Sequence, residues 1–253
     1  MEETGKNPIQ VAERLFQVIE CLAENGPMGI MDLSAELGFH KSTTHRLVTS
    51  LQYMGYIRQD EESLKYALSL KFLEIGSKIL EQTNMASLIH PSLKKLSEQT
   101  GETVHLVRRE GTEAVYIDKV ESTVSSIRMV SRVGSRIPLY CSGVGKALLA
   151  ELPDPEIEDI WNSSEITSLT PYTVTSLSDL MDRIRGVREA GYAMDDEENE
   201  EGVRCIAVSI PDYHKEPVYA LSISAPVSRM TDARIAELST DVLTFKKDLE
   251  KTL

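Results

Sequence analysis

Apolar residues recur at helical spacing in three successive runs near the start of the chain. PIQVAERLFQVIECLAE, residues 8–24, predicts an amphipathic helix that ends at Gly26. Residues 30–37 predict a shorter helix, which Gly38 would end. Only about three residues, Gly-Phe-His, connect this helix to the next one, which lies in the third run, HKSTTHRLVTSL (residues 40–51). So short a connection between two helices predicts a helix-turn-helix.

The third run has two chemically different faces when it is drawn as a helix. The face that would pack on the first two helices consists of Thr44, Leu47, Val48 and Leu51. The opposite face can bond to phosphate oxygens and base edges, and it consists of Ser42, His45, Arg46 and Thr49. Two alternatives without a role in binding remain open. Ser42 could serve only as the N-cap of the helix, and the three helices could form a plain bundle whose outer face is merely polar.

A β-hairpin is expected after Gly55. The strand-like YIRQ, residues 56–59, carries Arg58 and is followed by the acidic turn DEES and the strand-like LKYALSL. Residues 1–68 therefore predict a winged helix-turn-helix.

The rest of the chain predicts a helical linker over residues 69–83 and a larger domain over residues 84–253. Strand-like runs lie at residues 102–107, 114–120, 126–130, 205–210 and 218–225, with a turn around Asp212 and Lys215. Helical patterns lie at residues 86–101, broken by Pro91, and at 145–151, 178–190 and 231–251. This interleaving predicts an α+β fold with a mainly antiparallel sheet.

Charge sharpens the interpretation of the third helix. The chain has 40 acids against 27 Lys and Arg and a formal net charge of -13, so it does not coat DNA by charge alone. The stretch from Leu37 to Gln59 nevertheless contains no acid. Such a window removes repulsion from a surface that must approach phosphates. We expect a cytoplasmic protein, since the sequence has neither a signal-peptide layout nor an apolar run of bilayer length.

Three short motifs in the second part carry candidate chemistry. YCSGVGKALLAEL, residues 140–152, is a glycine-rich turn that enters an apolar helix, and a small carboxylate could bind the amides of Gly143 and Val144 with Ser142 nearby. In MDDEENEEGVRCIAV, the spacing could bring Asp195 and Cys205 to one cavity. The acids from Asp196 to Glu201 in the same motif are expected to form a solvated loop.

The third motif is Ser222-Ile223-Ser224, whose alternation places both hydroxyls on one side of a strand. Contact with a ligand and bonding within the sheet are equally open for these two hydroxyls. The three cysteines are widely spaced, so neither a disulfide framework, a metal site nor a cofactor is expected.

The order LSAELGFHKSTTHRLVTSLQYMGYI resembles the winged helix-turn-helix of the IclR-type transcriptional regulators. The resemblance implies that the third helix enters the major groove and that the wing, with Arg58, contacts the DNA backbone. The groove contacts that it implies are Lys41, Ser42, Thr43, His45 and Arg46, and Thr49 extends the same face.

The turn at residues 142–147 and the pattern from Asp195 to Cys205 resemble the same family's C-terminal effector domain, which is similar to GAF domains. The resemblance implies a small organic acid held by Gly143, Val144, Asp195 and Cys205, with the serine pair as added contacts. Apolar walls are expected from Met129, Ile137 and Val203. Tyr140-Cys141 departs from the family's usual pair ahead of the turn, which leaves the size and polarity of the pocket open.

We therefore expect a DNA-binding regulator that responds to a small acid. It would bind a palindromic operator as a dimer or tetramer. An ionised Asp195 would repel a second carboxylate, which favours a hydroxy- or keto-acid such as a sugar-derived acid. Two alternatives are an acyl-transfer enzyme that uses Cys205 as nucleophile and a DNA-binding scaffold without an effector.

Overall fold

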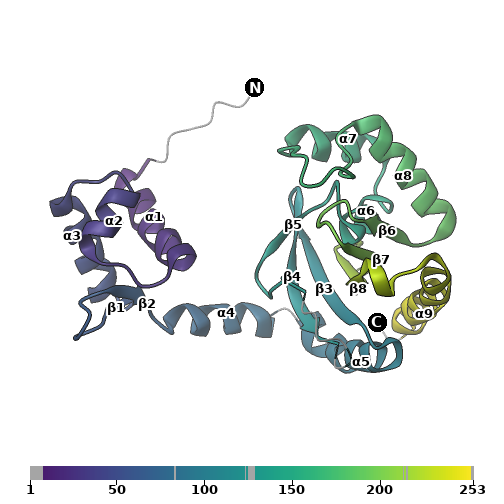
Figure 1. Cartoon of the computed structure of the whole chain (residues 1–253), viewed down its shortest axis with the longest axis horizontal. Coiled ribbons are helices and arrows are strands. Elements are labelled where there is room, and N and C mark those ends of the chain that lie inside the picture. The colour runs from purple at the N-terminus through teal and green to yellow at the C-terminus, as the bar shows by residue number, and fades with distance from the viewer. Residues whose placement is uncertain are drawn as a thin grey trace. The chain divides into compact units, whose positions relative to one another are not determined.

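The computed structural model describes residues 8–82, 84–122, 124, 129–212, 214 and 216–251. The chain forms two compact units, of which the first ends at Gln82 and the second begins at Thr83 (Figure 1). In the described part of the chain, no helix combines the length and the apolar character needed to cross a bilayer.

The first unit is a winged helix-turn-helix followed by one more helix. Its elements are α1 (Gln10–Asn25), α2 (Ile30–Glu36), α3 (Lys41–Tyr53), β1 (Ile57–Gln59), β2 (Tyr66–Leu68) and α4 (Lys71–Gln82). β1 and β2 pair as an antiparallel hairpin, with Arg58 opposite Ala67. Tyr66 also exchanges backbone hydrogen bonds with Met28, so the wing is attached to the segment between α1 and α2.

Burial explains why the three helices pack as they do. The side chains of Val18, Leu22, Leu33, Val48 and Leu51 have at most 2% of their surface exposed and form the core of this unit. Gly38 has φ of 65°, a conformation that a side chain would strain, and it makes the short turn between α2 and α3. A buried hydrogen bond of 3.0 Å from Ser34 to Thr44 joins the same two helices.

The second unit is built on one six-stranded antiparallel sheet in the order β5-β4-β3-β8-β7-β6. The strands are β3 (Thr103–Glu110), β4 (Glu113–Val120), β5 (Arg136–Pro138), β6 (Ala193–Asp196), β7 (Val203–Ile210) and β8 (Tyr219–Pro226). The helices are α5 (Asn84–Thr100), α6 (Gly143–Leu149), α7 (Asp154–Ser163), α8 (Leu177–Ala190) and α9 (Asp232–Glu250), with a 3₁₀ turn at Val227–Arg229. The predicted α+β fold with an antiparallel sheet is confirmed.

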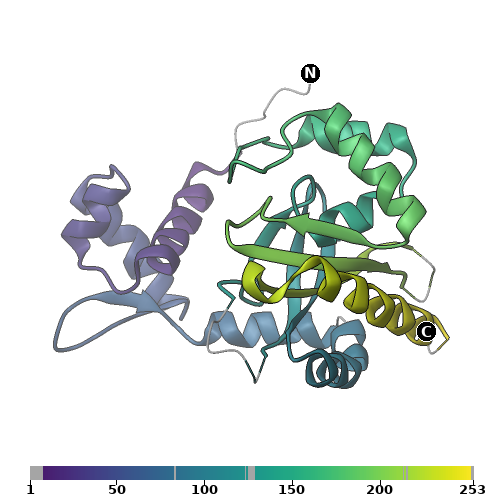
Figure 2. The same cartoon turned by 45° about the vertical axis from the view of Figure 1, so that its right-hand side comes forward.

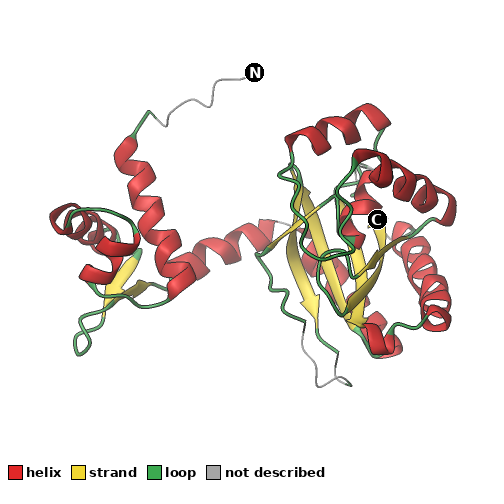
Figure 3. Cartoon of the chain, turned by 45° about the horizontal axis from the view of Figure 1, so that its top comes forward, coloured by secondary structure: helices red, strands yellow, loops and turns green. Residues whose placement is uncertain are grey.

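Helices cover both faces of this sheet, as Figures 2 and 3 show. α5 and α9 pack on the face that carries the large apolar side chains Leu106, Ile206, Val208, Leu221 and Ile223. α6, α7 and α8 lie on the other face, where the alternate residues of β7 and β8 are small or polar. Because successive side chains of a strand point to opposite faces, one pair of strands supplies both surfaces.

Several predicted elements differ from the structure. α5 runs through Pro91 without a break, because Ile89 and Leu93 on either side of it are fully buried. α7 and the short strand β5 had no clear periodic signal in the sequence. Of the strand predicted at 126–130, residues 126–128 lie outside the described residues, whereas Met129 and Val130 belong to no strand. Thr83 and Lys215 also lie outside the described residues.

Candidate functional site

The outer face of α3 is the candidate contact with DNA. We call it the recognition surface and define it by the side chains of Lys41, Ser42, Thr43, His45, Arg46 and Thr49. All of them are exposed except Thr43, which is half-buried. Thr44, Leu47, Val48 and Leu51 are buried on the opposite face, as the helical spacing predicts. The N-cap position of α3 is occupied by His40 without a side-chain cap bond, so the alternative that Ser42 is the N-cap is wrong.

The first unit exposes the positively charged side chains of Lys41, Arg46 and Arg58 to solvent. Arg58 is exposed on β1, and the exposed ends of Lys41 and Arg46 lie on α3. In the part of this unit that the structure describes, neither Lys41 nor Arg46 forms an ion pair. Guanidinium and ammonium groups that are not engaged by carboxylates can bind DNA phosphates and guanine edges.

A second group of polar residues lies in the second unit, on the sheet face that α6 covers. Asp195 on β6 stands directly opposite Cys205 on β7, and Cys205 stands opposite Ser224 on β8. The hydroxyl of Ser224 donates a 3.1 Å hydrogen bond to the sulfur of Cys205. The two residues that the sequence pattern could bring to one cavity are thus immediate cross-strand neighbours. Ser222 and Ser224 share the same side of β8, as their alternation predicts.

His105 on β3 extends this row of polar groups. It stands opposite Ser222, and its Nδ1 lies 3.4 Å from both serine hydroxyls. Its Nε2 lies 2.8 Å from the hydroxyl of Ser131, and its ring meets the edge of Tyr116 with the centroids 5.1 Å apart. Burial, aided by the charge of Lys119, lowers the pKa of His105 to about 3, so the imidazole is neutral.

The glycine-rich turn stands next to Asp195. Ser142 is the N-cap of α6, and its hydroxyl accepts a 3.1 Å hydrogen bond from the amide of Gly145. A Cβ added to Gly143 would lie 3.5 Å from the Cβ of Asp195, whereas one added to Gly145 would lie 2.2 Å from the carbonyl oxygen of Leu139. Gly145 therefore permits the close packing, and the first amides of α6, at Gly143 and Val144, are left without an intrahelical acceptor.

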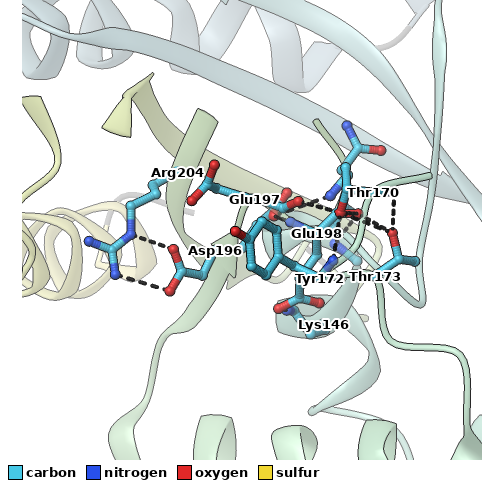
Figure 4. Close-up of polar contacts among 12 residues, drawn as sticks. Lys146, Thr170, Tyr172, Thr173, Asp196, Glu197, Glu198 and Arg204 are labelled. Atoms are coloured by element: carbon cyan, nitrogen blue, oxygen red, sulfur yellow. Dashed lines mark hydrogen bonds and ion pairs between the residues drawn. The ribbon is translucent and has the colours of Figure 1, made fainter. Parts of the chain in front are cut away.

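Lys146 and Glu198 form a buried ion pair beside this turn, with side chains 2% and 4% exposed. Figure 4 shows that neighbouring acids of the run diverge, since Asp196 points to Arg204 while Glu198 lies among Lys146, Thr170 and Thr173. The prediction that residues 196–201 form a solvated loop is therefore wrong for Glu198. Its charge is compensated within the fold by a lysine 52 residues upstream.

The structure also locates the three residues expected to line the walls. Ile137 is buried on β5, in the same apolar cluster as Tyr116 and Val144, and Val203 is half-buried at the start of β7. The carbonyl of Met129 accepts a hydrogen bond from Lys119, which ties that segment to β4. The unusual Tyr140 points elsewhere, because its hydroxyl is bonded to the backbone of Thr167 and its ring packs against Trp161.

Burial is the main cause of the shifted pKa values of Asp195, Cys205 and Cys141. Burial raises the pKa of Asp195 to about 7, although Lys146 and the amide of Glu198 oppose the shift. Burial and the charge of Asp195 raise the pKa of the Cys205 thiol well above its usual range, and they raise the pKa of Cys141 to about 12. Both thiols are therefore neutral at physiological pH.

Four members of the cluster are absent from the set predicted from the sequence, namely His105, Tyr116, Lys146 and Glu198. A sequence signal existed for Lys146, which stands in the apolar helix pattern KALLAEL, and for His105, which interrupts the strand pattern TVHLV. Nothing local marks Tyr116 or Glu198. Among the residues that the structure describes, no three His, Cys, Asp or Glu side chains gather in a way that could hold a metal ion.

Family models match both parts of the chain. Residues 11–61 match the IclR helix-turn-helix domain, and residues 77–250 match the C-terminal domain of the bacterial transcriptional regulator IclR. The acetate operon repressor of Salmonella typhimurium is 36% identical over 244 residues, which are 95% of this chain and 89% of that protein. The regulator XynR of Escherichia coli is 38% identical over 229 residues, 90% of each chain.

Solved structures lead to the same assignment. The crystal structure of the Thermotoga maritima IclR aligns with a TM-score of 0.81 and 31% identity, covering 96% of this chain and 98% of that one. The C-terminal domain of Escherichia coli KdgR is 36% identical and covers 61% of this chain and 89% of its own, with a TM-score of 0.55. The resemblance that the sequence motifs carry is confirmed. This chain belongs to the IclR family of bacterial transcriptional regulators.

Proposed function

We propose that this chain is a cytoplasmic repressor that binds a palindromic operator as a dimer or tetramer and is controlled by a small organic acid. The names of similar proteins support repression, since one is an acetate operon repressor and another a transcriptional repressor of Escherichia coli. In this proposal residues 1–68 bind DNA, residues 69–83 link the domains, and residues 84–253 bind the effector and hold the oligomer together.

For DNA, the proposal assigns base and phosphate contacts to the recognition surface. Arg46 and His45 are exposed near the middle of α3, where side chains of a helix in the major groove reach base edges. Arg58 on the wing contacts the adjacent backbone. The acid-free surface limits repulsion, while the acidity of the rest of the chain keeps non-specific affinity for DNA low.

For the effector, one observation carries the proposal. Asp195, Cys205, Ser224 and His105 form a continuous row of polar groups under the turn that precedes α6, on a sheet face where the neighbouring side chains of β7 and β8 are small. Buried polar groups in such a row are either satisfied by one another or by a ligand. The assigned contacts are Ser142, Gly143, Val144, Asp195, Cys205, Ser222 and Ser224, with walls from Met129, Ile137 and Val203. The ligand is a hydroxy- or keto-acid, including sugar-derived acids.

The alternative of an acyl-transfer enzyme receives little support from the cluster. A nucleophilic cysteine needs a thiolate and a base within reach. The pKa of Cys205 is raised by burial, and Ser224 lies between its sulfur and the neutral His105. We assign these groups to ligand recognition.

The test combines selection of an operator with ligand addition. Operator DNA is selected from random duplexes with the purified full chain, and gel shifts are then repeated with lactate, 2-oxobutyrate and gluconate. We expect at least one acid to change the operator affinity and to raise the melting temperature of the protein. A protein that binds DNA but whose affinity and melting temperature no organic acid alters would be the scaffold without an effector.

A further inference from the structure

Asp195 is a buried carboxyl group that forms no ion pair with the described residues around it. This carboxyl group is 4% exposed, and its Oδ1 accepts hydrogen bonds from the amides of Glu198 at 2.8 Å and Asn199 at 3.4 Å. The titratable groups that face it are Lys146 on α6, Cys141 before α6, Cys205 on β7, Tyr116 on β4, and Glu198 in the following loop. Glu200 in the same loop is exposed and faces Tyr116 and Cys205. α8, which also packs on β6, contributes apolar side chains such as Leu180 and Ile184.

The cation in this group is already engaged. Lys146 forms its ion pair with Glu198 inside the fold, so it is already paired before any ligand arrives. An ionised Asp195 then has no counter-ion of its own among the described residues that face it. A carboxylate ligand placed beside it would add a second uncompensated negative charge in a region shielded from water, which is strongly unfavourable.

We infer that the second unit takes up one proton, on Asp195, with each carboxylate ligand that it binds, and that the neutral acid then donates a hydrogen bond to the ligand. The proton comes from solvent and resides on Oδ2, since Oδ1 is held by two N–H donors. The inference rests on the proposed function and refines it. The repulsion that favoured hydroxy- and keto-acids is then absent, so simple monocarboxylates fit as well.

The cost of this proton is small near neutral pH. The pKa of Asp195 is raised to about 7 by burial, so the group is roughly half protonated in the free protein at that pH. Binding of an anion beside it raises its proton affinity further. Above pH 7 the observed affinity should fall by about tenfold for each pH unit, and below pH 6 it should be constant.

Calorimetry of the full chain with lactate, 2-oxobutyrate and gluconate tests the inference. At about pH 8, titrations in buffers of high and low ionisation enthalpy should report uptake of about one proton per ligand, and at about pH 6 uptake close to zero. Asp195→Asn keeps the acceptor and supplies a permanent donor, so its affinity should be independent of pH. The neighbouring Asp196→Asn, at an exposed site paired with Arg204, should titrate like the unmodified protein.

The possible results distinguish failure of the proton-uptake inference from failure of the proposed function. Binding whose affinity does not change with pH and that takes up no proton would overturn the inference and leave the proposed function standing. If no acid in the panel binds the unmodified protein or Asp195→Asn at any pH, the proposed function and the inference fail together. The buffer comparison needs no variant, so it decides the matter even if Asp195→Asn folds poorly.

Discussion

Lys146 on α6 and Glu198 in the loop after β6 are joined by an ion pair from which water is almost fully excluded. The pair connects the glycine-rich turn to the acidic run, and the hydroxyl of Thr173 donates to the carbonyl of Glu198 at 2.6 Å on its other side. The two sequence motifs that carry the family resemblance are thus parts of a single structure. A substitution in either motif is therefore expected to alter the structure of the other.

Removal of one charge of this pair should be costly. Lys146→Met leaves Glu198 buried without a counter-ion, and we expect it to lower the free energy of unfolding of the second unit by about 3–5 kcal/mol. The double variant Lys146→Met/Glu198→Met should recover most of that loss. Trp161, the single tryptophan of the chain, lies in this unit and reports its denaturant unfolding.

The exposed pair of Lys94 and Glu98 on α5, in the same unit, provides the control. Lys94→Met should change the stability of this unit by less than about 1 kcal/mol, because surface ion pairs contribute little. A loss for Lys146→Met as small as this would show that water reaches the Lys146–Glu198 pair.

Gly145 should tolerate no side chain. In Gly145→Ala the new Cβ would lie 2.2 Å from the backbone oxygen of Leu139, which cannot move as a flexible side chain can. We expect a loss of about 3 kcal/mol or more, at the upper end for overpacked sites. Gly186→Ala in α8 is the matched control, since nothing lies within 4 Å of its added Cβ, and it should gain about 0.5–1 kcal/mol. Equal melting temperatures for the two variants would contradict the packing described.

Asp195 and His105 should make opposite contributions to the pH dependence of stability. The folded pKa of Asp195 is about 7 against an ordinary 3.8, so the folded state holds the extra proton and stability falls as pH rises between these values. The folded pKa of His105 is about 3 against 6.5, so the unfolded state holds the extra proton and stability falls as pH drops from 6.5 towards 3. Between about pH 4 and 6.5 the two effects largely cancel.

Substituting either residue alone should reveal the pH dependence of stability that the other one contributes. In Asp195→Asn the stability of the second unit should rise with pH between 4 and 6.5, by up to about 1.4 kcal/mol per pH unit. In His105→Gln it should fall over the same interval by a similar amount. Unfolding followed by Trp161 fluorescence at several pH values measures both, with His214→Gln, at an exposed site in the same unit, as the control. Two variants with the same slope as the unmodified chain would rule out the described burial of these groups.

Arg46 and Arg58 should differ in their effect on DNA binding. Arg46→Ala should weaken binding to the selected operator by about 1–3 kcal/mol and relax the base preference, whereas Arg58→Ala should weaken binding to all sequences alike. Binding to operator and mutated operators is measured at several salt concentrations. Arg183→Ala, at an exposed site on α8, is the control. An unchanged affinity for both Arg46→Ala and Arg58→Ala would rule out α3 and the wing as the DNA contact.

The recognition surface could be predicted from sequence because helical periodicity alone decides which side chains of α3 point outward. Leu47, Val48 and Leu51 are apolar and spaced for one face, and no partner from the rest of the chain is needed to assign them. The cross-strand meeting of Asp195 and Cys205 could be anticipated for a related reason, because a short connection between two strands favours a hairpin.

The other residues of the polar cluster could not be predicted, because their neighbours are distant in the sequence and no local pattern encodes those contacts. The position of His105 beside Ser222 follows from the register of β3 against β8, residues 117 apart in the chain. Glu198 belongs to a run of acids that would suit a solvated loop, and only the tertiary position of Lys146 makes its burial tolerable. Pro91 likewise lies within a continuous helix because the sheet packs against the turns on both sides of it.

The alternation along β7 and β8 gives the two faces of the sheet different roles. Cys205, Ala207, Ser222 and Ser224 lie on the face where we propose that the effector binds, whereas Ile206, Val208, Leu221 and Ile223 anchor the sheet to α5 and α9. Odd positions of β7 and even positions of β8 can thus diversify while their neighbours preserve the scaffold. If the effector binds on this face, randomising Cys205, Ala207, Ser222 and Ser224 is a direct way to obtain regulators for other metabolites. The core between the sheet and the helices α5 and α9 would not change.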